Sequence, residues 1–144
     1  NACSAAYWVS AGAGPIVAGE LSTLGSIGAV VQLRNVVKAL DDEGVKVHTF
    51  KSGSLKMAGN PYEDLSDEAK EHYQKMVDTC AEIFMKDVAT ARGLKQETLK
   101  KAVGDGRTMH AKEALQNRLI DKIGTLSDAL KIVQADVKRR SRAR

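Results

Sequence analysis

The sequence predicts an α/β fold with parallel strands, because strand-like and helix-like apolar patterns alternate along the chain. Residues 33–44 carry a helical apolar spacing that ends at Gly44, a residue type that suits the position after a helix. Residues 45–50 then alternate apolar and polar side chains, and residues 26–31 form an apolar strand pattern before the helix. A strand, a helix and a second strand in this order are typical of a βαβ unit with parallel pairing.

The other elements follow from capping residues and apolar spacing. Ser66 is a good helix cap, and it precedes the longest helical pattern of the chain, which extends to Gly93. In the last helix we expect Ala129, Leu130 and Val133 to face inward. The remaining expected elements are a helix at 4–13, a strand at 16–18, a helix at 97–103, a turn at 104–106 and a helix at 127–137.

Length and composition indicate one globular domain. The chain has 144 residues, of which 43% are apolar and 28% are charged, as is ordinary for a protein with its own core. No apolar run approaches about 18 residues, so we expect no membrane span in this segment. The two cysteines, Cys3 and Cys80, lack the spacing of metal ligands. We therefore expect both to be reduced, and we expect no cofactor and no metal site.

The net charge of +4 comes from the end of the chain. Five basic residues gather there, and without them the charge is 4 − 5 = −1; they are Lys138, Arg139, Arg140, Arg142 and Arg144. We expect a domain at 1–137 and a disordered basic tail at 138–144. A weak contact of this tail with nucleic acid or an acidic partner is the alternative.

Ser4 is the candidate nucleophile. It stands among small residues, directly before a run that can start a helix. Such a helix would direct its free amide groups at the atom that the hydroxyl attacks, where negative charge develops. The alternative is that Ser4 is an ordinary N-cap, a position at which serine is common.

Lys56 is the candidate base. The three histidines, His48, His72 and His110, have no convincing carboxylate partner in the sequence, and we interpret His110 as structural. A lysine can act as a base when burial keeps it neutral. Lys56 has apolar and small neighbours and no acidic residue within three positions. This setting is unusual for a solvated lysine.

Several segments, in order, resemble the signal peptide peptidase A family of Ser–Lys serine peptidases over residues 1–135. They are Ala2–Trp8, similar to A-x-S-G-G-Y-Y/W; Leu24–Val30, similar to T-G-S-I-G-V; Lys51–Lys56, similar to K-S-G-x-x-K; and Asp105–Gly124, similar to D-G-R-V-W-T-G-x-x-A followed by G-L-V-D-x-I-G. Gly59–Tyr62 resembles the G-N-P-Y of tailed-phage head-maturation (prohead) proteases, whereas bacterial membrane forms tend to have S-P-F/Y-R.

The resemblance implies a fold and a set of site residues. The fold would be a crotonase/Clp-protease-like βαβ superhelix with a parallel sheet, whose N-terminal part is missing from these residues. Ser4 would be the nucleophile, Lys56 the general base, Ser26 the group that orients the lysine amine, and the Ala5 amide one oxyanion donor. The second donor would come from a glycine upstream of Asn1, and the strand that delivers Ser4 would be absent. Because Ala5 and Ala6 replace the usual Gly-Gly, a positive φ at either would be strained.

The resemblance also implies a role. We expect a serine endopeptidase that cleaves scaffold or capsid-assembly proteins during phage head maturation, in the prohead or the host cytoplasm. The alternatives are a membrane-associated bacterial peptidase that degrades cleaved signal peptides, a non-catalytic assembly domain, and a lyase or hydratase of the crotonase type. We expect a protein or peptide substrate and a homo-oligomer, a ring or dome. Residues 1–144 alone should not be a competent enzyme.

Overall fold

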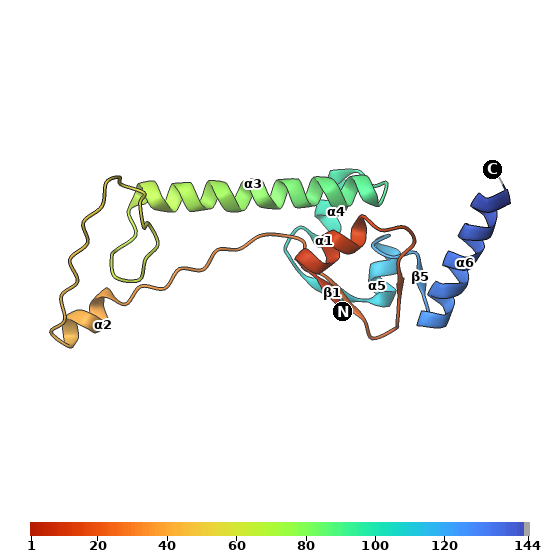
Figure 1. Cartoon of the computed structure of the whole chain (residues 1–144), viewed down its shortest axis with the longest axis horizontal. Coiled ribbons are helices and arrows are strands. Elements are labelled where there is room, and N and C mark those ends of the chain that lie inside the picture. Colours follow the sequence, from red (N-terminus) through yellow and green to blue (C-terminus); the bar gives the residue numbers. More distant parts are fainter. Residues whose placement is uncertain (143–144) are drawn as a thin grey trace. The chain divides into compact units, whose positions relative to one another are not determined.

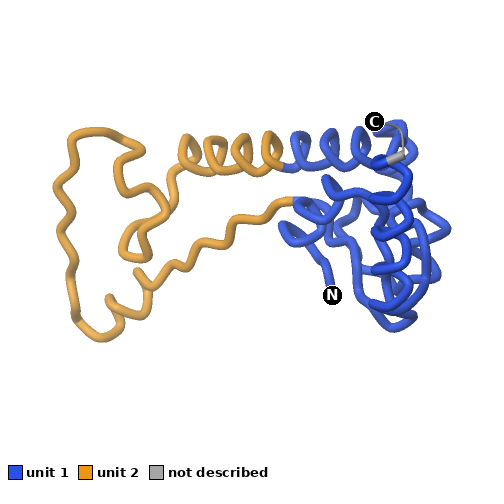
Figure 2. The backbone as a smooth tube through the Cα atoms, turned by 45° about the vertical axis from the view of Figure 1, so that its right-hand side comes forward, with its two compact units in different colours: residues 1–28, 81–144 blue, residues 29–80 orange. Residues whose placement is uncertain are grey.

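The computed structural model describes residues 1–142, and the chain consists of two compact units (Figure 2). Unit 1 combines Asn1–Gly28 with the chain from Ala81 onward, and unit 2 is Ala29–Cys80. A long segment is therefore inserted between the two halves of unit 1. One domain was expected at 1–137, and no feature of the sequence indicated this division.

Unit 1 contains two small sheets. In the first, β1 (Ala2–Cys3) pairs in parallel with β3 (Thr23–Gly25), and β3 pairs antiparallel with β4 (Thr108–His110). In the second, β2 (Val17–Ala18) pairs in parallel with β5 (Lys122–Ile123). The predicted α/β class with parallel pairing is thus present as pieces of sheet, mixed with one antiparallel pair.

The helices predicted at 4–13, 97–103 and 127–137 are confirmed (Figure 1) as α1 (Ala5–Ala11), α4 (Gln96–Val103) and α6 (Leu126–Arg142). Unit 1 also contains α5 (Ala111–Gln116), for which no range was predicted, and the C-terminal part of α3 (Asp67–Ala91). No helix in the described chain is both long enough and apolar enough to cross a membrane.

A capping box starts α6. The Thr125 amide donates to Asp128 Oδ2 over 2.9 Å, and the Asp128 amide donates to Thr125 Oγ1 over 3.3 Å. Hydrogen bonds from the Thr125 amide and hydroxyl lower the pKa of Asp128 to about 2. The helix continues through Arg142, so it includes most of the stretch that was expected to be a disordered tail, while Arg144 lies outside the described residues.

The inward face expected for the last helix is wrong. The side chains of Leu130 and Val133 are 53% and 58% exposed, and Ala129 is only partly buried. Leu130 and Val133 belong instead to an exposed apolar stripe, with Leu126 and Val137 at helical intervals on either side. The amphipathic pattern alone does not determine whether a partner covers the stripe within the same chain.

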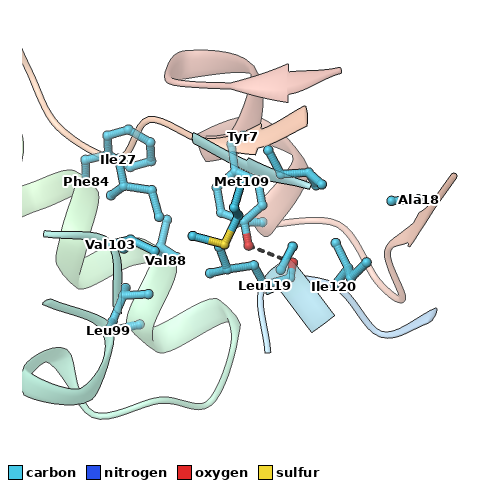
Figure 3. Close-up of a cluster of buried hydrophobic side chains, with 14 of the residues drawn as sticks. Tyr7, Ala18, Ile27, Phe84, Val88, Leu99, Val103, Met109, Leu119 and Ile120 are labelled. Carbon is cyan, nitrogen blue, oxygen red and sulfur yellow. Dashed lines mark hydrogen bonds between the residues drawn. The ribbon is translucent and has the colours of Figure 1, made fainter. Parts of the chain in front are cut away.

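The core of unit 1 is built around Tyr7 of α1. Its ring is fully buried, and its hydroxyl donates a 2.7 Å hydrogen bond to the Leu119 carbonyl (Figure 3). The next residue, Trp8, stacks on Phe84 with ring centroids 4.4 Å apart and donates from Nε1 to Asp87. These contacts fix α1, and with it the residue that precedes α1, against the rest of the core.

An ion pair links the residue that follows α3 to the chain around β2 and β5. Arg92, whose side chain is 8% exposed, donates to both carboxylate oxygens of Asp121 and to the Arg118 carbonyl. Asp121 also accepts from the Ile16 amide over 2.7 Å. Burial raises the pKa of Asp121, but the hydrogen bonds from Arg92 and Ile16 and the charge of Arg92 outweigh it, so the pKa is lowered.

Unit 2 has little regular structure apart from α2 (Val37–Asp42) and the N-terminal part of α3. The Ser66 cap is confirmed, because Ser66 Oγ accepts from the Ala69 amide over 3.2 Å. Gly44 has a φ of +74°, as expected after a helix.

The strands predicted at 26–31 and 45–50 are wrong: these segments are irregular chain, so His48 does not lie in a strand. Apolar alternation describes which side chains a strand could bury, but a strand also requires a neighbour for its backbone groups.

Candidate active site

Ser4 lies at a sharp turn between β1 and α1. Its backbone has φ 54° and ψ −130°, a conformation that residues other than glycine rarely adopt. Such a conformation costs about 1–3 kcal/mol and persists only where the surrounding structure imposes it. A strained turn from a strand into a helix exposes the residue at its apex. The expectation that no strand would deliver Ser4 is corrected, since Ala2–Cys3 form β1 directly before it.

The Ser4 hydroxyl does not cap α1. No capping hydrogen bond from this side chain is present, and the helix is started instead by the Ser4 carbonyl, which accepts from the Tyr7 and Trp8 amides over 2.9 and 3.0 Å. Ser4 is also exposed. The interpretation of Ser4 as an ordinary N-cap is therefore wrong, because its hydroxyl makes no hydrogen bond to the amides of α1.

Ala5 and Ala6 form the first turn of α1 without backbone strain. Neither is among the residues with positive φ, so replacing Gly-Gly by Ala-Ala costs nothing here. Amides in the first turn of a helix have no acceptor within that helix. The Ala5 amide, next to Ser4, is therefore free of helical bonds and can donate to a developing oxyanion.

Ser26 lies beside Ser4 at the same edge of the sheet. Cys3 of β1 pairs with Gly25 of β3, and because these strands are parallel, the residues that follow them are neighbours. The Ser4 amide donates to the Gly25 carbonyl over 2.9 Å. Ser26 also has a positive φ, of 53°. The structure thus brings together two of the predicted site residues, and both are held in strained conformations.

Gly25 allows a close approach between β3 and β4. Its φ is +103°, and a Cβ at this position would lie 2.8 Å from the Arg107 carbonyl oxygen. That same oxygen accepts a 2.8 Å hydrogen bond from the Ser26 amide. Sequence analysis used Arg107 only as part of a motif and missed this main-chain role, which no local pattern indicates.

Lys56 belongs to unit 2, whereas Ser4 and Ser26 belong to unit 1. Its amide donates to the Gly53 carbonyl over 3.0 Å within a series of turns, and its side chain is exposed. The burial expected for Lys56 is therefore not found in the described chain. The pairing of Lys56 with Ser4 stays a prediction.

The residues after Lys56 shape its loop. Asn60 donates from Nδ2 to the Met57 carbonyl and accepts at Oδ1 from the Tyr62 amide, each over 2.9 Å. Tyr73 of α3 donates to the Ala58 carbonyl over 2.8 Å, and Gly59, with a φ of +79°, leaves room for its hydroxyl. The Gly59–Tyr62 motif thus has a structural role in holding this loop against α3.

Two of the histidines and the cysteine beside Ser4 have surroundings of their own. His110 ends β4, precedes α5 without a capping bond and is exposed, and His72 is exposed on α3. Cys3 donates its thiol to the Thr23 carbonyl over 3.4 Å. Within residues 1–142, no group of three or more potential metal ligands gathers.

Comparisons with known proteins agree with the motifs. Residues 1–140 match the profile of peptidase family S49. The chain is 39% identical over 129 residues to a candidate protease of Methanocaldococcus jannaschii, covering 89% of this chain and 41% of that protein. It is 34% identical over 138 residues to a candidate signal peptide peptidase, SppA, of Enterococcus faecium, covering 96% and 40%. It is 27% identical over 132 residues to capsid assembly protease C of Escherichia phage lambda, covering 92% and 30%.

These alignments place the chain in its family. It spans at most 41% of the length of these three relatives, although the family profile covers nearly all of its own length. The profile match also includes the turn that carries Ser4 and the strand that precedes Ser26. The chain therefore belongs to peptidase family S49.

Proposed function

We propose that this chain carries the nucleophile and the base of a serine endopeptidase, Ser4 and Lys56. The observation that carries the proposal is the conformation of Ser4, an exposed serine at a strained strand–helix turn whose hydroxyl caps nothing. A serine that served only as a cap would bond to the helix amides. Membership of a peptidase family supplies the second support.

The proposed reaction proceeds by acyl transfer. Ser4 Oγ attacks the peptide carbonyl while Lys56, in its neutral form, takes the hydroxyl proton and then gives it to the leaving amine. The Ala5 amide stabilises the oxyanion of the tetrahedral intermediate. Water then attacks the acyl group with Lys56 again as the base, and Ser4 is regenerated. In this proposal Ser26 orients the lysine amine.

The first test compares variants of the full-length protein on a fluorogenic peptide. We expect Ser4→Ala and Lys56→Ala each to lower kcat/KM by about 10³-fold or more, the scale for loss of one member of a catalytic unit. His48→Ala, His72→Ala and His110→Ala are the matched controls and should keep their activity. Activity of Lys56→Ala within about threefold of the parent would remove Lys56 as the base.

A covalent probe separates the peptidase from its non-catalytic rivals. A fluorophosphonate should label the parent protein at Ser4 and should not label Ser4→Ala. A lyase, a hydratase or an assembly domain of the same fold has no need of an activated serine. An unlabelled, correctly folded parent would therefore favour those rivals.

For the biological role we propose phage head maturation, with cleavage of scaffold or capsid-assembly proteins. The Gly59–Tyr62 motif and the 27% identity to a phage capsid assembly protease support this role. The alternative is degradation of cleaved signal peptides, which the 34% identity to an SppA protein supports. Neighbouring portal and major capsid genes would favour the first role. The crotonase/Clp-like superhelix and a homo-oligomeric ring or dome belong to the same proposal.

A further inference from the structure

The carbonyl of Arg107 contacts Gly25 and Ser26, the residues whose main chain lies next to Ser4. It accepts the Ser26 amide over 2.8 Å, and it lies so close to Gly25 that a Cβ there would be 2.8 Å from the oxygen. The Gly25 carbonyl in turn accepts the Ser4 amide over 2.9 Å. A displacement of the Arg107 main chain would therefore reach Ser26 directly and Ser4 through one further peptide group.

The Arg107 main chain is held by its own side chain and by Asp105. The Arg107 amide donates to Asp105 Oδ1 over 3.1 Å, and the guanidinium donates from Nε and Nη2 to the same carboxylate over 2.6–2.9 Å. Gly106 between them has a φ of +76°, so the three residues form a tight turn directly before β4. The Asp105 carboxylate thus accepts hydrogen bonds from both the main chain and the side chain of Arg107.

This turn contributes little to the core. The side chains of Asp105 and Arg107 are 54% and 55% exposed, and exposed ion pairs add little to folding stability. Their position matters more, because a displacement of about 1 Å can lower a catalytic rate by about 100-fold. Ser26 is especially sensitive, since its φ of 53° persists only while neighbouring bonds impose it. Loss of the turn should therefore alter reaction rate more than stability.

We propose that the Asp105–Arg107 turn positions Ser26, and through Gly25 also Ser4, for the reaction. The inference rests on the proposed function, because it assigns Arg107 and Asp105 as positioning residues for that same site. Neither residue touches the substrate in this proposal. Arg107 acts through its carbonyl, and Asp105 acts through Arg107.

The test uses Arg107→Ala, Asp105→Ala, the double variant and Arg107→Lys in the full-length protein. For each alanine variant we expect kcat to fall about 10–100-fold while KM stays within about threefold, with a slower rate of fluorophosphonate labelling at Ser4. The double variant should be no worse than either single one, because both break the same turn. Arg107→Lys keeps the charge but not the two-pronged geometry, so it should restore activity only in part.

Two readouts separate positioning from general structural damage. If Ser26 orients the Lys56 amine, its displacement should also move the pH at which activity is half-maximal, which a uniformly destabilised protein would not show. Thermal midpoints should stay within a few degrees of the parent. Arg139→Ala is the matched control, because it breaks an exposed ion pair with Asp136 on α6 and should change none of these quantities.

The proposal is overturned if Arg107→Ala keeps kcat within about threefold of the parent while Lys56→Ala is inactive. It is also overturned if kcat falls only in proportion to stability and the pH profile does not move. An inactive, unlabelled parent protein would instead refute the proposed function, and the positioning role with it. The three outcomes are distinguished within one set of variants.

Discussion

Ser4 and Ser26 occupy backbone conformations that glycine would adopt at less cost. Their φ values are 54° and 53°, and only two other residues that are not glycine share a positive φ in the described chain, Met57 and Arg118. A serine at such a position is kept against a penalty of about 1–3 kcal/mol. Because the Ser4 hydroxyl does not cap the helix, helix capping does not explain the serine, and the proposed role as nucleophile would give its side chain a use.

Glycine at position 4 should relieve this strain. We expect Ser4→Gly to have a free energy of unfolding about 1 kcal/mol greater than that of Ser4→Ala, because only glycine adopts this φ and ψ without a steric cost. Chemical denaturation of the two variants measures the difference. Ser10→Gly inside α1 is the control and should lose about 0.5–1 kcal/mol, since glycine disfavours a helix interior. Equal stabilities of the two position-4 variants would contradict the strain.

The buried hydroxyl of Tyr7 should make stability depend on pH in the alkaline range. Burial raises its pKa from about 10 to about 12, with a smaller lowering by Arg92 and a smaller raising by Asp121. The unfolded chain therefore loses this proton first, and stability should fall as the pH rises from about 10 to about 12. Below about pH 10 the contribution is complete.

Tyr7→Phe tests this directly. At about pH 8 it should lose about 1–3 kcal/mol of unfolding free energy, because the Leu119 carbonyl is left buried without its donor. Between about pH 10 and about pH 12 the variant should lose less stability than the parent. Tyr62→Phe, at a half-exposed residue of unit 2, is the control and should follow the parent. Parallel losses in parent and Tyr7→Phe above about pH 10 would contradict the assignment.

At the scale of elements, the contact between β3 and β4 should tolerate no side chain at Gly25. Gly25→Ala would place a Cβ 2.8 Å from the Arg107 carbonyl oxygen at a φ of +103°. We expect a loss of about 1–3 kcal/mol of unfolding free energy together with a loss of activity. Gly28→Ala is the matched control, because a Cβ there meets no atom within 4 Å and its φ is not positive. Equal thermal midpoints of the two variants would contradict the close approach.

The helices could be predicted from the sequence because their signals are local. Ser66 begins α3 and the left-handed Gly44 follows α2, each through a hydrogen bond to a residue three positions away. Four short strands, β1, β3, β4 and β5, were missed, because two or three residues are too few to display a period, and their partners lie far away in the sequence. The strand predicted at 45–50 had a clear period but no partner. Periodicity thus reports potential burial, and pairing depends on the rest of the chain.

The candidate site was predictable as a set of residue types and not as a geometry. Motif order selected Ser4, Ser26 and Lys56 from many serines and lysines, and the register of β1 and β3 shows Ser4 and Ser26 to be neighbours. Serine has no intrinsic preference for positive φ, so the strained conformations depend on tertiary hydrogen bonds such as that from Ser26 to Arg107. For the same reason the exposure of Lys56 could not be predicted from its apolar neighbours.

At the scale of the whole molecule, the two units differ in how much they bury. The buried core cluster lies in unit 1, with Tyr7, Phe84, Val88 and Leu119 among its members (Figure 3). Within residues 29–80 only Ala69 is buried, while Phe50 is 96% exposed. Local opening costs little where few apolar contacts are lost. Unit 2 should therefore open more readily than unit 1.

Hydrogen exchange of the backbone amides measures this difference. We expect strong protection in α1 and at residues 81–91 of α3, because both pack on the core, and weaker protection at residues 67–80 of the same helix. Residues 46–50 should exchange rapidly, since they belong to no helix or strand, whereas the neighbouring Val45 amide donates to the Leu40 carbonyl and should be slower. Strong protection at 46–50 would contradict the prediction. Repeating the exchange at several protein concentrations would then show whether a second copy pairs with residues 46–50, as the proposed homo-oligomer allows. Protection by a second copy should weaken on dilution, whereas protection within one chain should not.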